Sequence, residues 1–254
     1  MQEYTIHPVK TGEFKAIEKS NLMYQHDCGT KLVAPIIMYC IKGRDRVIVV
    51  DTGGSDEEWA EKWHHGLVRT PDMHPAEGLR RIGVDVRDVD TVINTHLHWD
   101  HSFNNEIFAN ATFYVQKREI EYAVNPLPCH WVYYESWQLG LTPRWMRTYS
   151  RFKVLDGDYN LCPGIDLVTL PGHTPGFQGV LVQTARGPIL IASDCMGLFE
   201  SWTGTSLYKH VPSGIHYRLD EYYKSIDKMD TLCDFILPGH DPKVFDQEMY
   251  PLPG

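Results

Sequence analysis

The sequence predicts a layered α/β fold, and three observations support this prediction. The chain has 254 residues, of which 43% are hydrophobic and 22% charged, a composition typical of a globular protein with a sizeable core. Its predicted elements run in the order strands, helices, strands, helix, strand. No linker rich in glycine, serine or proline separates two halves. We therefore expect residues 1–254 to form a single domain in which helices lie outside packed sheets.

Two strands are predicted within the first 54 residues. Residues 33–43 (VAPIIMYCIKG) and residues 44–54 (RDRVIVVDTGG) are apolar runs joined by the turn residues KGRD, which is the pattern of two paired strands. The second run ends at Asp51, which a threonine and two glycines follow. A carboxylate therefore stands at the carboxyl end of a buried strand.

Two helices and a further strand are expected next. Ser55 is suited to cap a helix over residues 56–66, and Pro75 stands where a proline opens a helix over residues 75–83. The two histidines near the end of the first helix are expected on its solvated face. Residues 90–101 (DTVINTHLHWDH) begin as a short buried strand.

Residues 126–152 follow a helix predicted over residues 117–124 and are rich in aromatic side chains, with three of the seven tryptophans and three of the fourteen tyrosines. Tyr133, Trp137 and Leu141 recur every four residues, so we expect this insertion to be helical in part. It serves either as packing for the core or a homodimer contact, or as the wall of a substrate pocket. Both interpretations stay open.

Strands return after the insertion. They are predicted over residues 152–156, 165–170, 179–185 and 187–194, followed by a helix over residues 219–232 and a last strand over residues 234–241. Two of these strands end in Pro-Gly-His, which hints at two similar halves. Runs of strands with helices between them favour sheets covered by helices.

Charge and composition argue against several functional classes. The net charge of −9 and the sequence pI near 5.8 disfavour nucleic-acid binding, which needs a basic surface. The first residues, MQEYTIHPVK, lack the apolar centre of a signal peptide, and no apolar run approaches the length of a membrane span. Six cysteines without a CxxC pair are typical of buried thiols in a reducing compartment. We therefore expect a cytoplasmic protein that binds neither nucleic acid nor membranes.

The segment NTHLHWDHSFNN, residues 94–105, concentrates metal-binding side chains. His96 and His98 are two residues apart at the end of a strand, so both rings point to the same side. Asp100 and His101 follow where the chain turns toward a helix, and they can reach a second point nearby. This spacing predicts two adjacent metal sites that share one motif.

Three further candidates stand far away in the sequence. His173 lies in LPGHTPG, Asp194 in ILIASDC and His240 in LPGHD, and each follows an apolar strand, where α/β proteins build their sites. Histidine and aspartate ligands suit Zn²⁺ and also accept Mn²⁺, Fe²⁺ or Co²⁺. Cys195 is the neighbour of one candidate, but adjacent side chains of a strand point oppositely, so we expect it to be structural.

These motifs together resemble the metallo-β-lactamase superfamily and, within it, the N-acyl-homoserine lactonase family. The resemblance covers nearly the whole chain: VDTG, HLHWDH, PGHTPGFQ, a strand that ends in aspartate, and a late GHD. It implies a four-layer αββα sandwich with two divalent metal ions, Zn²⁺ before others, at the edge of the sheets. It also implies a small lactone or ester as the substrate.

The resemblance gives each candidate a role. One metal would be held by His96, His98 and His173, the other by Asp100, His101 and His240, and Asp194 would bridge the two together with a hydroxide. Asp51 would support the ligands from outside the cluster. Asp100 and Asp194 would be the catalytic residues.

The chemistry of such a centre points to hydrolysis. Two divalent cations outweigh two carboxylates and a hydroxide, so the centre can hold that nucleophile at neutral pH. The hydroxide would attack a carbonyl, the second cation would stabilise the oxyanion, and Asp100 or Asp194 would pass a proton to the leaving alkoxide. The predicted function is opening of a lactone ring, with N-acyl-homoserine lactones as first candidates. The alternative is hydrolysis of another lactone or carboxylic ester, and an iron-dependent, persulfide dioxygenase-like oxidation is less favoured.

The chain departs from the lactonase pattern near the predicted bridging residue. Members of that family usually carry a tyrosine three residues after it, whereas this chain has Gly197. Tyr133, Tyr134 or Tyr208 would then supply a hydroxyl from another loop. The substrate pocket is predicted to involve Trp99, Phe103, Phe177 and Phe199 beside the ligands, His130, Trp131 and Trp137 from the insertion, and Tyr208.

Overall fold

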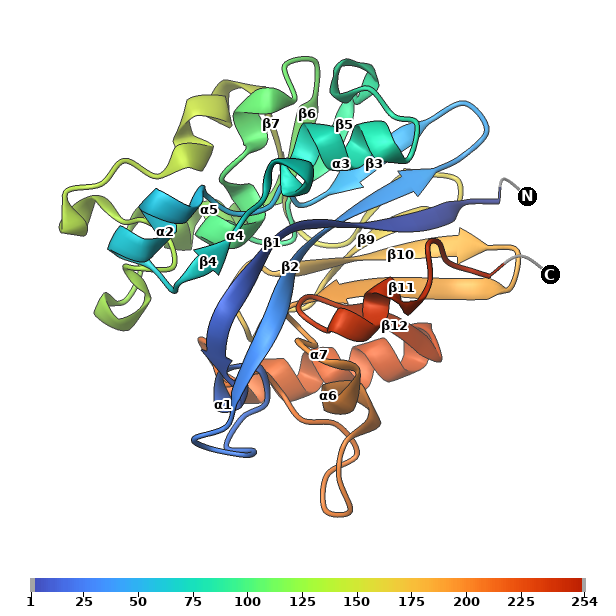
Figure 1. Ribbon diagram of the computed structural model, residues 1–254. Helices are drawn as coiled ribbons and strands as arrows, with labels where there is room; N and C mark the ends of the chain where they lie inside the picture. The colour runs from blue at the N-terminus through green and yellow to red at the C-terminus, as the bar shows by residue number, and fades with distance from the viewer. Residues whose placement is uncertain (1–2, 253–254) are drawn as a thin grey trace.

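Two β-sheets packed face to face form the centre of the structure (Figure 1), a computed structural model that describes residues 3–252. The larger sheet has seven strands in the order β4-β1-β2-β3-β5-β6-β7, and the smaller has five in the order β12-β11-β10-β9-β8. Strands β3, β5, β6 and β7 pair in parallel, as do β11 and β12, and the other pairs are antiparallel. Parallel strands place their carboxyl ends at the same edge of a sheet, which is where sites form.

The larger sheet consists of β1 (Thr5–Glu18), β2 (Lys31–Lys42), β3 (Val47–Val50), β4 (Leu67–Val68), β5 (Thr91–Ile93), β6 (Thr112–Gln116) and β7 (Phe152–Leu155). The smaller sheet consists of β8 (Tyr159–Cys162), β9 (Ile165–Thr169), β10 (Gln178–Thr184), β11 (Gly187–Ser193) and β12 (Phe235–Pro238). The α-helices are α1 (Lys19–Leu22), α2 (Glu57–Trp63), α3 (Pro75–Arg81), α4 (Trp99–Ser102), α5 (Lys117–Val124), α6 (Phe199–Thr203) and α7 (Leu219–Leu232). The 3-10 helices are η1 (Pro71–Met73), η2 (Val86–Asp88), η3 (Asn105–Ile107), η4 (Pro128–His130), η5 (Trp137–Leu139), η6 (Arg144–Arg151) and η7 (Pro242–Asp246).

The two sheets share one hydrophobic core. Side chains from their facing surfaces meet between them, such as Ile48 from the larger sheet and Val180 and Ile191 from the smaller, and all three are fully buried. The Tyr39 hydroxyl also crosses the interface and donates a hydrogen bond to the carbonyl oxygen of Pro238 at 2.6 Å. Burial of this apolar surface therefore fixes the sheets relative to each other.

Helices cover the outer faces of both sheets. Leu79 of α3 and Ala123 of α5 belong to one apolar cluster with Val92 of β5. On the other side, Ile226 of α7 belongs to a cluster with Leu190 of β11. Figure 1 shows α7 running along the outside of the smaller sheet and α3 on the opposite side of the molecule. The predicted four-layer αββα sandwich is therefore confirmed.

Most predicted elements lie where the sequence pattern indicates. The strand predictions within residues 33–54 correspond to β2 and β3, Pro75 opens α3, and α7 spans its predicted range. The cap prediction for α2 is wrong, because Asp56 and not Ser55 occupies that position. The Asp56 carboxylate accepts a hydrogen bond from the Trp59 N–H at 2.8 Å, which satisfies one free donor of the first turn.

The aromatic segment, residues 126–152, contains the 3-10 helices η4, η5 and η6 and no α-helix. Gly140, which has a φ of 76°, ends η5 within the four-residue repeat that the sequence suggests, and Pro128 and Pro143 stand just outside the repeat at the starts of η4 and η6. Trp145 packs into the core cluster outside the larger sheet, whereas more than half of Trp137 is exposed. The segment therefore combines a core anchor with a solvent-facing part.

The described helices and the cysteines can be compared with what composition predicts about membrane spans and thiols. None of the helices within residues 3–252 is long and apolar enough to cross a membrane. All six cysteines are free thiols, and Cys40, Cys195 and Cys233 are buried. The Cys195 sulfur packs 3.6 Å from the sulfur of Met229, in the apolar cluster beneath α7. This environment is that of a structural cysteine.

Candidate metal centre

The seven predicted ligands lie together at one edge of the sandwich, in the loops that follow strands and, for Asp100 and His101, in the short helix α4. The motif of residues 96–101 follows β5 of the larger sheet, while His173, Asp194 and His240 follow β9, β11 and β12 of the smaller sheet. The exposed fraction of every one of the seven is between 0 and 8%. Both sheets therefore contribute side chains to a single buried cluster.

The ligand atoms form three overlapping groups, and within each group they lie within 4.8 Å of one another. The groups are His96, His98 and His173; His96, His101 and Asp194; and Asp100, His101 and His240. Asp194 lies between the ends of the cluster: its Oδ1 is 3.1 Å from Nε2 of His240, and its Oδ2 is 3.6 Å from Nε2 of His173. The Asp194 carboxylate is therefore close to histidines of both other groups.

The protein holds ring nitrogens that face away from the cluster. Nδ1 of His96 lies 3.0 Å from the Thr95 hydroxyl, and Nδ1 of His101 lies 2.8 Å from the Asp51 carboxylate. Nδ1 of His173 lies 2.7 Å from the Ile215 carbonyl, and Nδ1 of His240 lies 2.8 Å from the Pro35 carbonyl. A carbonyl or carboxylate acceptor keeps the proton on Nδ1 and leaves the lone pair of Nε2 directed at the cluster. This is how metal-binding histidines are held in proteins.

Several atoms that face the cluster lack a hydrogen-bond partner among the described residues. Nε2 of His96 and Oδ1 of Asp194 are buried without one, and Nε2 of His101 lies 3.3 Å from that oxygen but is not aligned for a bond. A buried polar atom left unpaired costs about 1–3 kcal/mol. Two divalent cations would satisfy these atoms with nitrogen and oxygen ligands of the usual kind. The residues present therefore fit a dinuclear centre.

The three histidines of the first group are held neutral. Burial lowers the pKa of His173 to about 4. Burial, reinforced by the neighbouring histidines, also lowers the pKa of His96 and of His98 well below the ordinary value. A neutral imidazole offers a lone pair to a cation without first losing a proton, so these three side chains are prepared to act as ligands.

The second group has the opposite balance. Burial acts to lower the pKa of His101 and of His240, but the charge of Asp194, aided by Asp100, outweighs it and raises both above the ordinary value. Burial likewise acts to raise the pKa of Asp194, but His240 and His101 hold it well below its usual range. This balance favours a positive charge beside Asp194, which a divalent cation would supply.

Glu119 of α5 supports the cluster and was not expected from the sequence. Its fully buried carboxylate accepts hydrogen bonds from the Leu97 N–H at 2.9 Å, the Tyr134 hydroxyl at 2.8 Å, the Thr174 hydroxyl at 2.6 Å and the Gly176 N–H at 3.3 Å. Leu97 stands between two ligands of the motif, and Thr174 follows His173. Glu119 therefore ties two ligand-bearing loops together. The available signal was its position one turn before Ala123, on the buried face of the helix.

A narrow cavity of about 30 Å³ opens above the cluster. Its lining includes Trp99 and the polar side chains of Asn21, His65, Tyr133 and Ser213. This volume is about that of one water molecule, so a lactone enters only if side chains at the mouth rotate. His65 and Tyr133 are half-buried and stand at this boundary.

The expectation that the two histidines near the end of α2 face solvent is wrong. The helix ends at Trp63, so neither histidine follows its outer face. The His64 side chain is 1% exposed, lies 3.0 Å from the Glu135 carboxylate and stacks on Trp99 with ring centroids 4.0 Å apart. His65 lines the cavity.

Of the predicted pocket residues, Trp99 lines this cavity. Phe177 is fully buried beneath the cluster, with its ring centroid 5.2 Å from that of His96. The remaining six, which are Phe103, His130, Trp131, Trp137, Phe199 and Tyr208, line no part of it. A wider substrate pocket that includes the other predicted residues stays a prediction.

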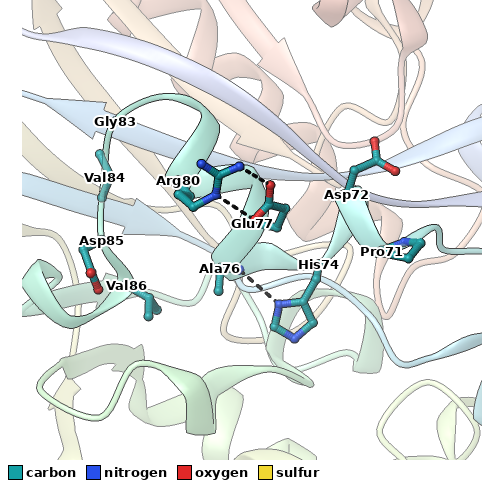
Figure 2. Close-up of a pocket in the computed structure, with 10 residues that line it drawn as sticks. All are labelled: Pro71, Asp72, His74, Ala76, Glu77, Arg80, Gly83, Val84, Asp85 and Val86. Atoms are coloured by element: carbon teal, nitrogen blue, oxygen red, sulfur yellow. Dashed lines mark hydrogen bonds and ion pairs between the residues drawn. The ribbon is translucent and has the colours of Figure 1, made fainter.

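A wider surface groove lies elsewhere, against η1, α3 and η2 (Figure 2). In this groove Glu77 and Arg80 pair with each other, and the His74 ring accepts a hydrogen bond from the Ala76 N–H at 3.3 Å. These side chains serve the local structure of α3. None of the seven predicted ligands lines the groove, so it is separate from the candidate centre.

The sequence is similar to known hydrolases over most of its length. Residues 35–240, which include all seven predicted ligands, match the family described as the metallo-beta-lactamase superfamily. An N-acyl homoserine lactonase of a Bacillus species is 29% identical over 194 residues, which is 72% of this chain and 71% of that protein. The N-acyl homoserine lactonase AttM of Azorhizobium caulinodans is 27% identical and aligns over 95% of both chains.

Solved structures share the fold. A mutant of AiiA from Bacillus thuringiensis, with N-decanoyl-L-homoserine bound at its active site, superimposes with a TM-score of 0.79 at 23% identity, over 97% of this chain and 96% of that one. AidC, described as a dizinc quorum-quenching lactonase in complex with its product, gives a TM-score of 0.71 at 18% identity, over 94% of this chain and 88% of that one.

Proposed function

We propose a function from one premise: the chain belongs to the metallo-β-lactamase superfamily. We propose that it is a dinuclear-metal hydrolase that opens lactone rings, with N-acyl-homoserine lactones as its substrates. The observation that carries this proposal is the position of Asp194 between two sets of buried ligand atoms. The relatives that are named N-acyl homoserine lactonases support the choice of substrate.

The metal ions and the protein would divide the work of catalysis. When bound, two Zn²⁺ ions supply a hydroxide at neutral pH and polarise the substrate carbonyl. Asp194 sets the distance between the two ligand sets. Asp100 borders the cavity, and we assign to its carboxylate the transfer of a proton to the leaving alkoxide. Six cysteines without a disulfide bond support a cytoplasmic location for this single-domain enzyme.

Hydrolysis of another lactone or of a carboxylic ester is the second candidate. It is favoured by Gly197, which offers no hydroxyl where lactonases of this kind usually carry a tyrosine. The reaction type is the same in both cases, since a hydroxide adds to an ester carbonyl and an alkoxide leaves.

The test is a pH-stat assay of protein loaded with Zn²⁺ or Co²⁺. The panel holds short- and long-chain homoserine lactones, simple γ- and δ-lactones, an aromatic lactone and a linear ester, with Asp100→Asn as the blank. We expect the homoserine lactones to be hydrolysed fastest. Hydrolysis of another lactone or of the linear ester, without hydrolysis of the homoserine lactones, would favour the second candidate. No acid release from protein shown to hold two metal ions would refute the hydrolase proposal.

A further inference from the structure

Tyr133 is the tyrosine that lines the cavity above the ligand cluster. Its side chain lines the cavity together with Asp100, and its ring centroid lies 5.3 Å from that of His98. Its backbone carbonyl accepts a hydrogen bond from the Trp99 N–H at 2.8 Å, which ties Tyr133 to the motif that carries the ligands. This bond holds the backbone of Tyr133 beside the motif.

The hydroxyl of Tyr133 has no hydrogen-bond partner within residues 3–252. The hydroxyls of the nearby Tyr134 and Tyr122, in contrast, both have partners. The Tyr134 hydroxyl donates to Glu119 at 2.8 Å, and the Tyr122 hydroxyl lies 2.7 Å from Nδ1 of His130. A polar group that stays unpaired at the mouth of a buried site is available to a ligand.

A tyrosine hydroxyl has an ordinary pKa of about 10, so it carries its proton at neutral pH. Such a group can donate a hydrogen bond to a substrate oxygen.

The other positions that the sequence suggests do not supply a free hydroxyl at the cavity. A Cβ atom at Gly197 would lie 3.2 Å from the Cβ atom of Leu22 and 3.3 Å from its carbonyl oxygen. A side chain at this position would therefore be crowded by Leu22. Half of Tyr208 is exposed, and it does not line the cavity. The Tyr134 hydroxyl is already engaged with Glu119.

We infer that Tyr133 is a catalytic residue whose hydroxyl donates a hydrogen bond to the carbonyl oxygen of the substrate. This inference rests on the proposed hydrolase function. As the water oxygen bonds to the carbonyl carbon, an electron pair of the C=O bond moves to the carbonyl oxygen, and the hydroxyl of Tyr133 stabilises the charge that forms there. The pair then returns, the ring C–O bond breaks, and the proton of the water passes by way of Asp100 to the alkoxide. Tyr133 keeps its own proton throughout.

The test compares Tyr133→Phe with the wild-type enzyme on the fastest substrate of the panel, both fully loaded with metal. Loss of one such donor should lower kcat by about 100-fold and leave KM nearly unchanged, because the bond strengthens as charge develops. Tyr149→Phe is the matched control, since Tyr149 lies in the same segment and is 53% exposed. Metal content, melting temperature and the absorption spectrum of the Co²⁺ form should be the same in all three proteins.

A second comparison locates the bond on the substrate. A donor at the carbonyl oxygen gives the same loss of kcat with an alkyl ester and with a nitrophenyl ester. A loss that disappears for the nitrophenyl ester would place the hydroxyl at the leaving group and overturn the assignment.

The outcomes separate this inference from the proposed function. Equal kcat values for Tyr133→Phe and wild type on a hydrolysed substrate would overturn the role of Tyr133 alone. A change in the Co²⁺ spectrum that accompanies the loss would also overturn it, because the residue would then act on the ligands. A wild-type enzyme that hydrolyses nothing with both metals bound would overturn both proposals.

Discussion

Oδ2 of Asp51 lies 2.8 Å from Nδ1 of His101, and the same oxygen accepts a hydrogen bond from the Thr95 hydroxyl at 2.8 Å. Asp51 therefore joins the end of β3 to α4 through His101 and to the loop after β5 through Thr95, and it directs Nε2 of His101 at the cluster. Asp51→Asn tolerates the φ of 60° at this position but lacks the negative charge that supports the imidazole. Metal affinity should fall by about 10–100-fold.

Metal content after dialysis against graded chelator, measured by mass spectrometry, checks this prediction. Asp45→Asn is the control, because Asp45 is an exposed aspartate in the turn before β3. Equal affinities in the two variants would show that Asp51 does not support the ligand.

Glu119→Gln should destabilise the metal-free protein. The amide nitrogen that replaces one carboxylate oxygen cannot accept the hydrogen bonds made there, so buried donors lose their partner. The free energy of unfolding should fall by about 3 kcal/mol. Urea titration measures it, with Glu121→Gln, exposed on the same helix, expected to match wild type. A loss as small as that of the control would contradict the role of Glu119 in joining the two loops.

Metal binding should release protons from the second group of ligands. The raised pKa of His101 and of His240 favours the protonated form of both rings in the metal-free protein, whereas the pKa of His173, lowered to about 4, leaves that ring neutral at pH 7. Zinc must displace the protons that these two rings carry, so its binding near neutral pH releases protons. Calorimetry in two buffers of different ionisation enthalpy counts them. The number of protons released should decline as the pH rises through the raised pKa values of His101 and His240. A number that grows with pH would show that these two histidines are not the source of the protons.

Gly239→Ala should weaken metal binding through Asp194. A Cβ atom on Gly239 would lie 2.2 Å from Oδ1 of Asp194, which forces that carboxylate to move. Affinity for at least one of the two ions should fall tenfold or more, by about 1.4 kcal/mol. Gly66→Ala is a suitable comparison, because its Cβ would meet the flexible ends of Lys15 and Glu61. Unchanged zinc titrations for Gly239→Ala would mean that the carboxylate relaxes without leaving the cluster.

The layers and the ligand cluster could be predicted from the sequence because each has a local signal. Apolar runs with period two mark the strands, and the motif of residues 96–101 places four donors within six positions. His173, Asp194 and His240 were recognisable because each follows such a run. Strand β1 had no equally clear signal, since Pro8 and Gly12 interrupt it, and pairing with β2 and β4 stabilises it instead.

The surroundings of the cluster could not be predicted because tertiary packing creates them. Glu119 and Thr174 are 55 residues apart in the sequence, and no local pattern joins them. His65 reaches the cavity only because α2 ends at Trp63 and the chain then changes direction. Tyr133 was one of three equivalent candidates in the sequence, and it alone lines the cavity.

The aromatic segment, residues 126–152, contains no predicted ligand, although Tyr133 at its centre borders the cavity. Tyr133 and Tyr134 are hydrogen-bonded to Trp99 and to Glu119, so changes at these two positions also reach the ligand motif. The exposed positions of the segment, such as Trp137, have no such bond within residues 3–252 and can vary more freely. Evolution of this protein is therefore expected to change the solvent-facing part of the segment more readily than the part that contacts the ligands.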